Sequence, residues 1–158
     1  MKKLFAPLVA ASLLICGCGD INKTYETYEI VKKGVDMTTI EITASKNGWH
    51  DSKEGEGNPG FYVYQQFDFP EITPEIFNDG SVLVYMIEHA EEYTCKHILP
   101  YVYPRDVVDG NNRFQIMQNI RYEVEPGLLT IAVEWQDFYK CPLNEDFKFD
   151  VCILSPGK

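Results

Sequence analysis

The sequence predicts an all-β fold, an antiparallel β-sandwich of about seven or eight strands with one short helical turn. Apolar and polar residues alternate with period two through most of the chain after residue 35, and turn-forming residues separate these runs. The 158 residues, 45% of them hydrophobic, suit one domain with a single core. Stacked sheets bury one face of each strand, so the pattern favours a sandwich, with a small barrel as the alternative.

The chain is acidic. It holds 14 Lys+Arg against 24 Asp+Glu, a formal net charge of −10. Proteins that bind nucleic acids use Lys and Arg to neutralise phosphates, so we expect no nucleic-acid partner. No sequence motif indicates a cofactor.

The N-terminus has the pattern of a secretory signal peptide. Lys2 and Lys3 precede an apolar run from Leu4 to Ile15, which is too short to span a membrane. The run ends in Cys16-Gly17-Cys18, which matches a bacterial lipoprotein processing site with Cys18 as the acylated residue. We expect a cleaved signal peptide over residues 1–17 and lipidation of Cys18. The alternative is an ordinary signal peptide cut nearby.

Residues 18–34 are expected to form a lipid-anchored tether with an edge strand near Tyr28–Val31, and residues 35–158 the sandwich domain. Removal of residues 1–17 leaves 12 basic against 24 acidic residues. Such a surface is repelled by anionic headgroups, so acyl chains on Cys18 would hold the protein at the membrane. This predicts a location in the bacterial cell envelope, at the outer membrane.

The first half of the domain shows two alternating runs. Ile40, Ile42 and Ala44 share one strand face. A polar loop over residues 51–60, rich in glycine, separates this strand from the next one. There the inward residues are Phe61, Val63, Phe67 and Phe69, and they alternate with Tyr62, Tyr64, Gln66 and Asp68.

A single turn of helix should follow. Thr73-Pro74-Glu75 supplies a hydroxyl cap, a proline at the first helical position and an acid in the first turn, and Asn78-Asp79-Gly80 ends it. Val82 to Ile87 is apolar on both faces and predicts a buried strand. We expect Ile98–Tyr103 to be its hairpin partner.

The last three strands alternate clearly. Gln118 interrupts an apolar face that runs from Phe114 to Val124. Pro126-Gly127 forms a tight turn into the next strand, which ends near Trp135. After a loop over residues 137–145, the final strand buries Phe147, Phe149, Val151 and Ile153.

Several segments in this order resemble a family of small envelope lipoproteins of Bacteroidetes. The matching pieces are Pro70-Glu71-Ile72-Thr73, Gly80-Ser81-Val82-Leu83-Val84-Tyr85 and Leu99-Pro100-Tyr101, within residues 38–156. The resemblance implies an immunoglobulin-like β-sandwich and no assigned activity. Some relatives carry a collagen-like stretch after the lipidated cysteine, which this chain lacks.

Catalytic and metal motifs are weak. The chain lacks the Gly-x-Ser-x-Gly elbow of hydrolases and the His-x-x-x-His or paired-cysteine spacing of zinc sites. The segment Glu88–His97, expected to be a polar hairpin loop, gathers two histidines, three acids and a cysteine. Asp106, Asp109, Asn111 and Asn112 offer oxygen ligands for calcium in a second loop, where turn formation is an equal explanation.

Export would permit one disulfide among Cys95, Cys141 and Cys152. Cys141 and Cys152 would be about a strand length, roughly 20 Å, apart, beyond disulfide reach. If each connection reverses the chain direction, Cys95 and Cys152 lie at the same end of the sandwich, so we expect Cys95–Cys152 if a bridge forms. Three unpaired thiols are the alternative.

The most distinctive surface feature is a set of tyrosines, because a tyrosine ring offers rigid area with a polar tip. Tyr62, Tyr64, Tyr101 and Tyr103 are candidates for a surface that recognises a glycan or an envelope protein. We therefore expect a non-catalytic binding or structural module. The alternatives are a glycan-active enzyme and an assembly subunit that exchanges strands, as in fimbriae.

Overall fold

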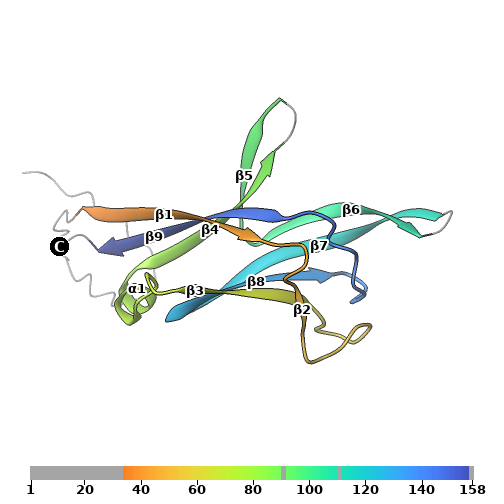
Figure 1. Cartoon of the computed structure of the whole chain (residues 1–158), viewed down its shortest axis with the longest axis horizontal. Helices are drawn as coiled ribbons and strands as arrows, with labels where there is room; N and C mark the ends of the chain where they lie inside the picture. The colour runs from red at the N-terminus through yellow and green to blue at the C-terminus, as the bar shows by residue number, and fades with distance from the viewer. Residues whose placement is uncertain (1–33, 90–91, 110–111, 157–158) are drawn as a thin grey trace, which may run out of the picture. The chain divides into compact units, whose positions relative to one another are not determined.

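The structure is a computed structural model that describes residues 34–89, 92–109 and 112–156. Within these ranges the chain forms nine strands and one short helix, arranged as two antiparallel sheets that pack as a sandwich (Figure 1). The predicted all-β sandwich is confirmed. The strand number exceeds the expected seven or eight because it includes a two-residue strand, β2.

Four strands form one sheet, in the order β1-β9-β4-β5. Their bounds are Val35–Ala44 for β1, Phe147–Pro156 for β9, Ser81–His89 for β4 and Thr94–Ile98 for β5. The second sheet has five strands, in the order β2-β3-β8-β7-β6. These are β2 (His50–Asp51), β3 (Val63–Phe69), β8 (Gly127–Trp135), β7 (Asn112–Glu125) and β6 (Tyr101–Asp109).

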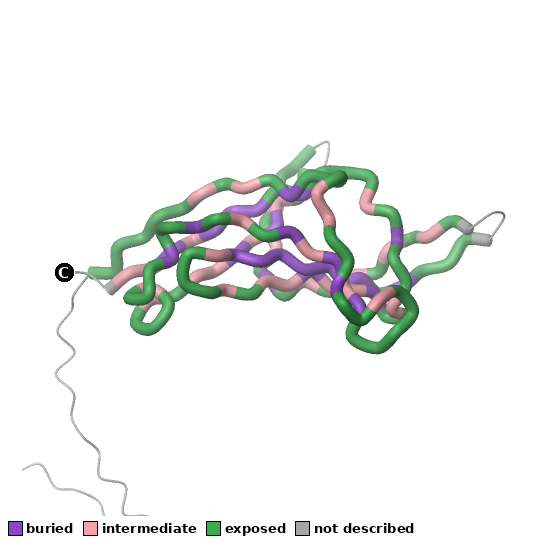
Figure 2. Tube along the Cα trace, turned by 60° about the horizontal axis from the view of Figure 1, so that its bottom comes forward, coloured by how far each residue is buried: buried purple, intermediate pink, exposed green. Residues whose placement is uncertain are grey.

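The core lies between the two sheets and follows the predicted alternation. Figure 2 shows buried segments along the strands and exposed segments at the loops and hairpin ends. The inward residues of β3, β8 and β9 are buried or packed against the core, as period-two patterning requires. They include Val63, Phe69, Leu129, Ile131, Val133, Trp135, Phe149, Val151 and Ile153, and Phe61, just before β3, is buried with them.

The helical turn is also confirmed, as α1 (Pro74–Asp79). The Thr73 hydroxyl accepts a hydrogen bond from the Ile76 amide at 3.2 Å, and Pro74 occupies the first turn. Gly80 ends the helix and packs so closely that a Cβ there would lie 2.5 Å from the Leu154 carbonyl oxygen. The turn thus carries the chain from β3 in one sheet to β4 in the other.

The expected pairing of Ile98–Tyr103 with the buried strand is wrong beyond Ile98. β5 pairs with β4 through Ile98, opposite Tyr85, and the chain then crosses at the cis Leu99–Pro100 bond. Tyr101 begins β6, which pairs with β7 in the other sheet. The segment Ile98–Tyr103 therefore contributes residues to both sheets, Ile98 to one and Tyr101–Tyr103 to the other.

The signal peptide, Cys18 and the expected edge strand at Tyr28–Val31 lie outside the described residues. In the part of the chain that the structure covers, no helix has the length and apolar character needed to cross a bilayer.

Candidate functional site

The four predicted recognition tyrosines occupy two different places. Tyr62 and Tyr64 lie on the outer face of the five-stranded sheet, because they alternate with the buried Phe61 and Val63. Tyr101 and Tyr103 stack on each other at 5.1 Å between ring centroids and pack against the core. The structure therefore does not unite them in one surface.

Tyr103 packs against the core and bonds to a buried side chain. Its hydroxyl accepts a hydrogen bond from the Gln118 amide nitrogen at 2.6 Å, and burial raises the pKa of Tyr103 to about 12. Tyr101 stacks on His97 with ring centroids 4.1 Å apart. Both tyrosines also line a cavity of about 390 Å³ beside the start of β9.

Tyr62 and Tyr64 belong to a surface that we call the outer tyrosine face, formed by Tyr62, Tyr64, Gln66, Arg121 and Thr130. The two tyrosine rings lie 6.0 Å apart, and the Arg121 guanidinium lies 4.8 Å from the centre of the Tyr62 ring. Such a contact between a cation and a ring holds both groups in place.

The strand register places a small residue, Ala132, at the centre of this face. Ala132 on β8 lies opposite both Tyr64 on β3 and Arg121 on β7. Its outward methyl group is nevertheless fully buried, because larger side chains flank it on both sides. Because Ala132 is small and its neighbours Tyr64 and Arg121 are large, the surface is lower at Ala132 than on either side of it.

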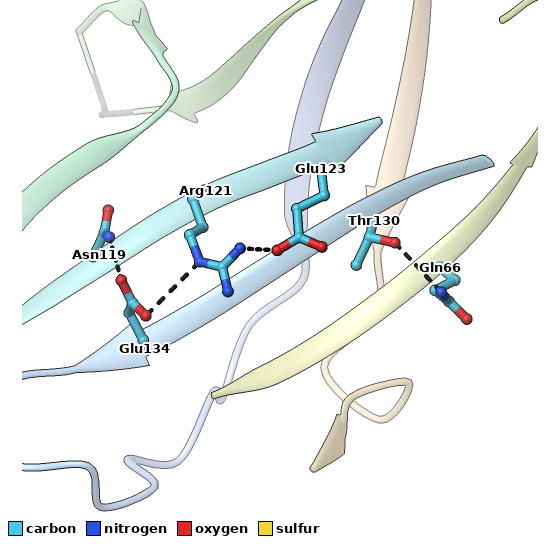
Figure 3. Close-up of polar contacts among 6 residues, drawn as sticks. All are labelled: Gln66, Asn119, Arg121, Glu123, Thr130 and Glu134. Carbon is cyan, nitrogen blue, oxygen red and sulfur yellow. Dashed lines mark hydrogen bonds and ion pairs between the residues drawn. The ribbon is translucent and has the colours of Figure 1, made fainter. Parts of the chain in front are cut away.

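Charged and amide groups form a connected row across β7 and β8, as Figure 3 shows. Arg121 donates a hydrogen bond to Glu123, and its Nε lies 3.8 Å from Glu134 Oε2. Glu134 also accepts from the Asn119 amide at 2.6 Å. Burial alone would lower the pKa of Arg121, but Glu123 and Glu134 outweigh burial and raise it.

Beside this row lies a groove of about 300 Å³. Gln66 and Thr130 lie in it, and the Gln66 amide donates to the Thr130 hydroxyl at 3.4 Å (Figure 3). Ser52 and Glu54 from the loop after β2 also line the groove, with Glu123. Its lining thus combines aromatic rings with groups that donate and accept hydrogen bonds.

The loop that borders the groove is held by its own hydrogen bonds. The Ser52 amide donates to the Tyr62 carbonyl at 2.9 Å, and the Ser52 hydroxyl accepts from the Tyr62 amide. A hydrogen bond with Ser52 lowers the pKa of Glu54, which keeps that carboxylate ionised. Lys140 pairs with Asp51 at the end of β2 at 2.7 Å, and its backbone amide donates to Glu56 in the loop at 2.8 Å, which ties the loop to the segment after β8.

Asp106, one of the candidate calcium ligands, does not lie in a loop as the sequence suggested. This residue lies within β6, opposite Gln115, and pairs with Arg113 at 2.6 Å. The Arg113 and Gln115 hydrogen bonds lower the pKa of Asp106, so its carboxylate is ionised but already paired. Asp109 ends the same strand opposite Asn112, and Asn111 lies outside the described residues.

The expected Cys95–Cys152 disulfide is not formed. Cys95 lies opposite Glu88 on β4, whereas Cys152 lies opposite Leu83, five residues away along the same strand. That spacing is roughly 16 Å at 3.3 Å per residue, far beyond disulfide reach. The prediction failed because β9 begins beside the β4–β5 hairpin, so the chain reaches Cys152 well away from Cys95.

The polar partners of the outer tyrosine face, Arg121, Glu123 and Glu134, were not among the site residues predicted from the sequence. A usable signal was present: Arg121 and Glu123 alternate with the buried Ile120 and half-buried Tyr122, which places them together on the outward face. The prediction considered only tyrosines and therefore left out the charged row.

The fold and this site together define a β-sandwich with a polar, tyrosine-bearing sheet face. Searches with the chain find no matching family model, no matching curated protein and no matching solved structure.

Proposed function

We propose that the protein is a lipid-anchored, immunoglobulin-like β-sandwich of the bacterial envelope that binds a glycan on its outer tyrosine face. The anchor is proposed from the sequence alone: a signal peptide over residues 1–17, with acyl chains on Cys18. The acidic balance of the remaining chain supports anchoring by acyl chains, because acidic surfaces are repelled by anionic lipids. The outer membrane is the proposed location.

One observation carries the binding proposal: two tyrosine rings 6.0 Å apart border a groove whose lining combines hydroxyl and amide groups with charged side chains. The uncharged polar residues are Ser52, Gln66 and Thr130, and the charged ones are Lys53, Glu54, Glu123 and Glu125. Sugars present C–H faces that pack on aromatic rings and hydroxyls that both donate and accept hydrogen bonds. Tyr62, Tyr64, Gln66 and Thr130 supply both kinds of contact. A groove of about 300 Å³ is at the lower end of the range for small-molecule sites.

A protein partner is less well supported on this face. Stable protein interfaces have an apolar, desolvated centre with a polar rim. Here the carboxylates of Glu123 and Glu134 lie beside Arg121, and carboxylates are depleted from the centres of such interfaces. A ligand rich in hydroxyls can bond to these polar groups without desolvating a charge that lacks a partner.

A binding assay on immobilised glycans tests the proposal, with the full-length chain in detergent. We expect saturable binding to at least one glycan class, weakened about 10-fold or more by Tyr62→Ala or Tyr64→Ala, since losing an aromatic contact costs more than about 1 kcal/mol. Tyr93→Ala is the matched control, because Tyr93 is 62% exposed on another hairpin. Binding that ignores all three substitutions would refute the site.

Metabolic labelling with palmitate tests the anchor separately. We expect label in the wild-type protein and in Cys16→Ser, and none in Cys18→Ser. Label that persists in Cys18→Ser would refute the assigned lipidation site.

An assembly subunit that exchanges strands is the second candidate, and the edge strand β1 favours it. Within the described residues β1 pairs on one side only, with β9, and its residues Val35 and Met37 are each 66% exposed. Light scattering of the purified chain would detect the oligomers this function requires. A strictly monomeric protein across the micromolar range would contradict it.

A further inference from the structure

Three side chains that ligate metals meet on the β4–β5 hairpin. Glu88 on β4 lies directly opposite Cys95 on β5, and His97 follows two residues later on the same strand face. His97 Nε2 lies 2.8 Å from Glu88 Oε2 and 3.2 Å from Cys95 Sγ, and the sulfur lies 3.8 Å from the same carboxylate oxygen. The two ends of the segment expected to be a loop, residues 88–89 and 94–97, are therefore paired strands that bring these atoms together.

The triangle of ligand atoms is close in size to a face of a metal coordination sphere, because its sides of 2.8, 3.2 and 3.8 Å average about 3.3 Å. Ligand atoms around tetrahedral zinc lie roughly 3.3–3.6 Å apart, given bonds of about 2.0–2.3 Å. The three distances here fit a point roughly 1.9 Å from all three atoms. An ion could bind after shifts of a few tenths of an ångström.

Glu88 Oε2 is the shared acceptor of this cluster, because the Cys95 thiol and His97 Nε2 both lie within hydrogen-bond reach of it. The sulfur also lies 3.2 Å from Nε2, so the three ligand atoms converge on one place. A cation bound there would take the place of the thiol proton and of any proton on Nε2.

We propose that Glu88, Cys95 and His97 bind a zinc ion. Nitrogen, thiolate and carboxylate ligands suit Zn²⁺, and three protein ligands leave a coordination position for water or a further ligand. On binding, the Cys95 thiol releases its proton to solvent and the sulfur forms a bond to the metal. This inference is independent of the proposed glycan site, because none of its residues lies on the outer tyrosine face.

The surroundings favour a defined and accessible site. His97 stacks on Tyr101 with an angle of 15° between the rings, which fixes the orientation of the imidazole. Glu88 is exposed and Cys95 and His97 are half-buried, so an ion can enter from solvent. In Figure 1 the end of the β4–β5 hairpin extends beyond the other strands, and a metal at its base would brace it.

Cobalt titration of the full-length chain, reduced and freed of metal, tests the proposal. We expect one equivalent of Co²⁺ to give a thiolate-to-cobalt absorption band and intense tetrahedral visible bands, both removed by added Zn²⁺. Cys95→Ser should abolish the thiolate band. Loss of a residue that only supports a metal ligand weakens metal binding by about 10-fold to 100-fold. His97→Gln removes a ligand itself, so we expect the affinity for cobalt to fall on the order of 100-fold.

Two controls match the ligands in chemistry but lie outside the cluster. His89→Gln removes an imidazole bonded to Thr94, and Cys152→Ser removes a thiol beside Thr39, so both should bind cobalt like the wild type. Glu88→Gln changes an exposed side chain and should leave the fold intact. We expect this variant to bind cobalt more weakly, and that loss would come from the missing ligand and not from unfolding. No saturable binding by the wild type, or a thiolate band that survives Cys95→Ser, would overturn the proposal.

Discussion

Gln118 is a fully buried polar residue whose side chain forms hydrogen bonds to three other side chains. It is fully buried in the middle of β7, among apolar side chains. Its carbonyl oxygen accepts hydrogen bonds from Trp135 Nε1 at 2.9 Å and from Arg105 at 2.8 Å, and its amide donates to the Tyr103 hydroxyl at 2.6 Å. One side chain thus bonds to three groups from two neighbouring strands, β6 and β8.

Gln118→Leu should destabilise the protein by about 2–4 kcal/mol. The leucine fills a similar volume, but the Trp135 indole N–H, on a residue only 2% exposed, loses its partner. A buried donor without a partner costs about 1–3 kcal/mol, and the lost bond to the charged Arg105 adds to this. Better transfer of leucine into an apolar core offsets part of the loss.

Urea unfolding followed by tryptophan fluorescence measures the effect, since Trp135 reports directly on the network. With a slope of about 2 kcal/mol per molar urea, the midpoint should fall by about 1–2 M. Gln118→Glu keeps the acceptor oxygens and should lose less. Gln115→Ala, on the exposed face of the same strand, should change stability by about 0.5 kcal/mol at most. If Gln118→Leu proved as stable as Gln115→Ala, the network would contribute nothing and the reasoning would fail.

Two further predictions concern packing and thiol chemistry. Gly80→Ala should lower the melting temperature by about 5–10 °C, because its Cβ would lie 2.5 Å from the Leu154 carbonyl oxygen, whereas Gly34→Ala, with no atom within 4 Å, should leave it unchanged. Differential scanning calorimetry compares the two, and equal melting temperatures would show that the backbone moves freely there. Burial raises the pKa of the Cys141 thiol, so at pH 8 iodoacetamide should alkylate Cys141 more slowly than a model thiol, and the rate should rise only as the pH passes the ordinary thiol range. Peptide mass spectrometry over time measures this rate, and alkylation at the model rate would contradict a buried, protonated thiol.

Local patterning predicted the faces of the strands because burial repeats with the pleat of a single strand. Ala44, Phe61, Ile131 and Phe149 are all fully buried, as their alternation with polar residues indicated. The helical turn followed equally from local rules, since Thr73, Pro74 and Gly80 each act on neighbouring backbone groups. Such features depend on residues a few positions apart.

Strand pairing depends on residues far apart in sequence, and here the predictions failed. β9 lies between β1 and β4, so the last strand pairs with the first, and the position of Cys152 relative to Cys95 follows from that order. Turn signals mark where strands end, but they do not say which sheet the next strand enters. The crossing at Leu99–Pro100 shows this, because β5 ends at Ile98 in one sheet and β6 begins at Tyr101 in the other, only three residues later.

The same distinction explains both candidate sites. Glu88 and His97 are nine residues apart with an expected loop between them, and only the β4–β5 register puts their side chains 2.8 Å apart. On the outer tyrosine face, Arg121 reaches Tyr62 from β7 across the intervening strand β8. The sequence supplies the residue types and the face each occupies, while the register decides which of them meet. A substitution that slips β5 by one residue against β4 would therefore turn Cys95 and His97 to the face opposite Glu88, and should abolish cobalt binding without changing any of the ligands.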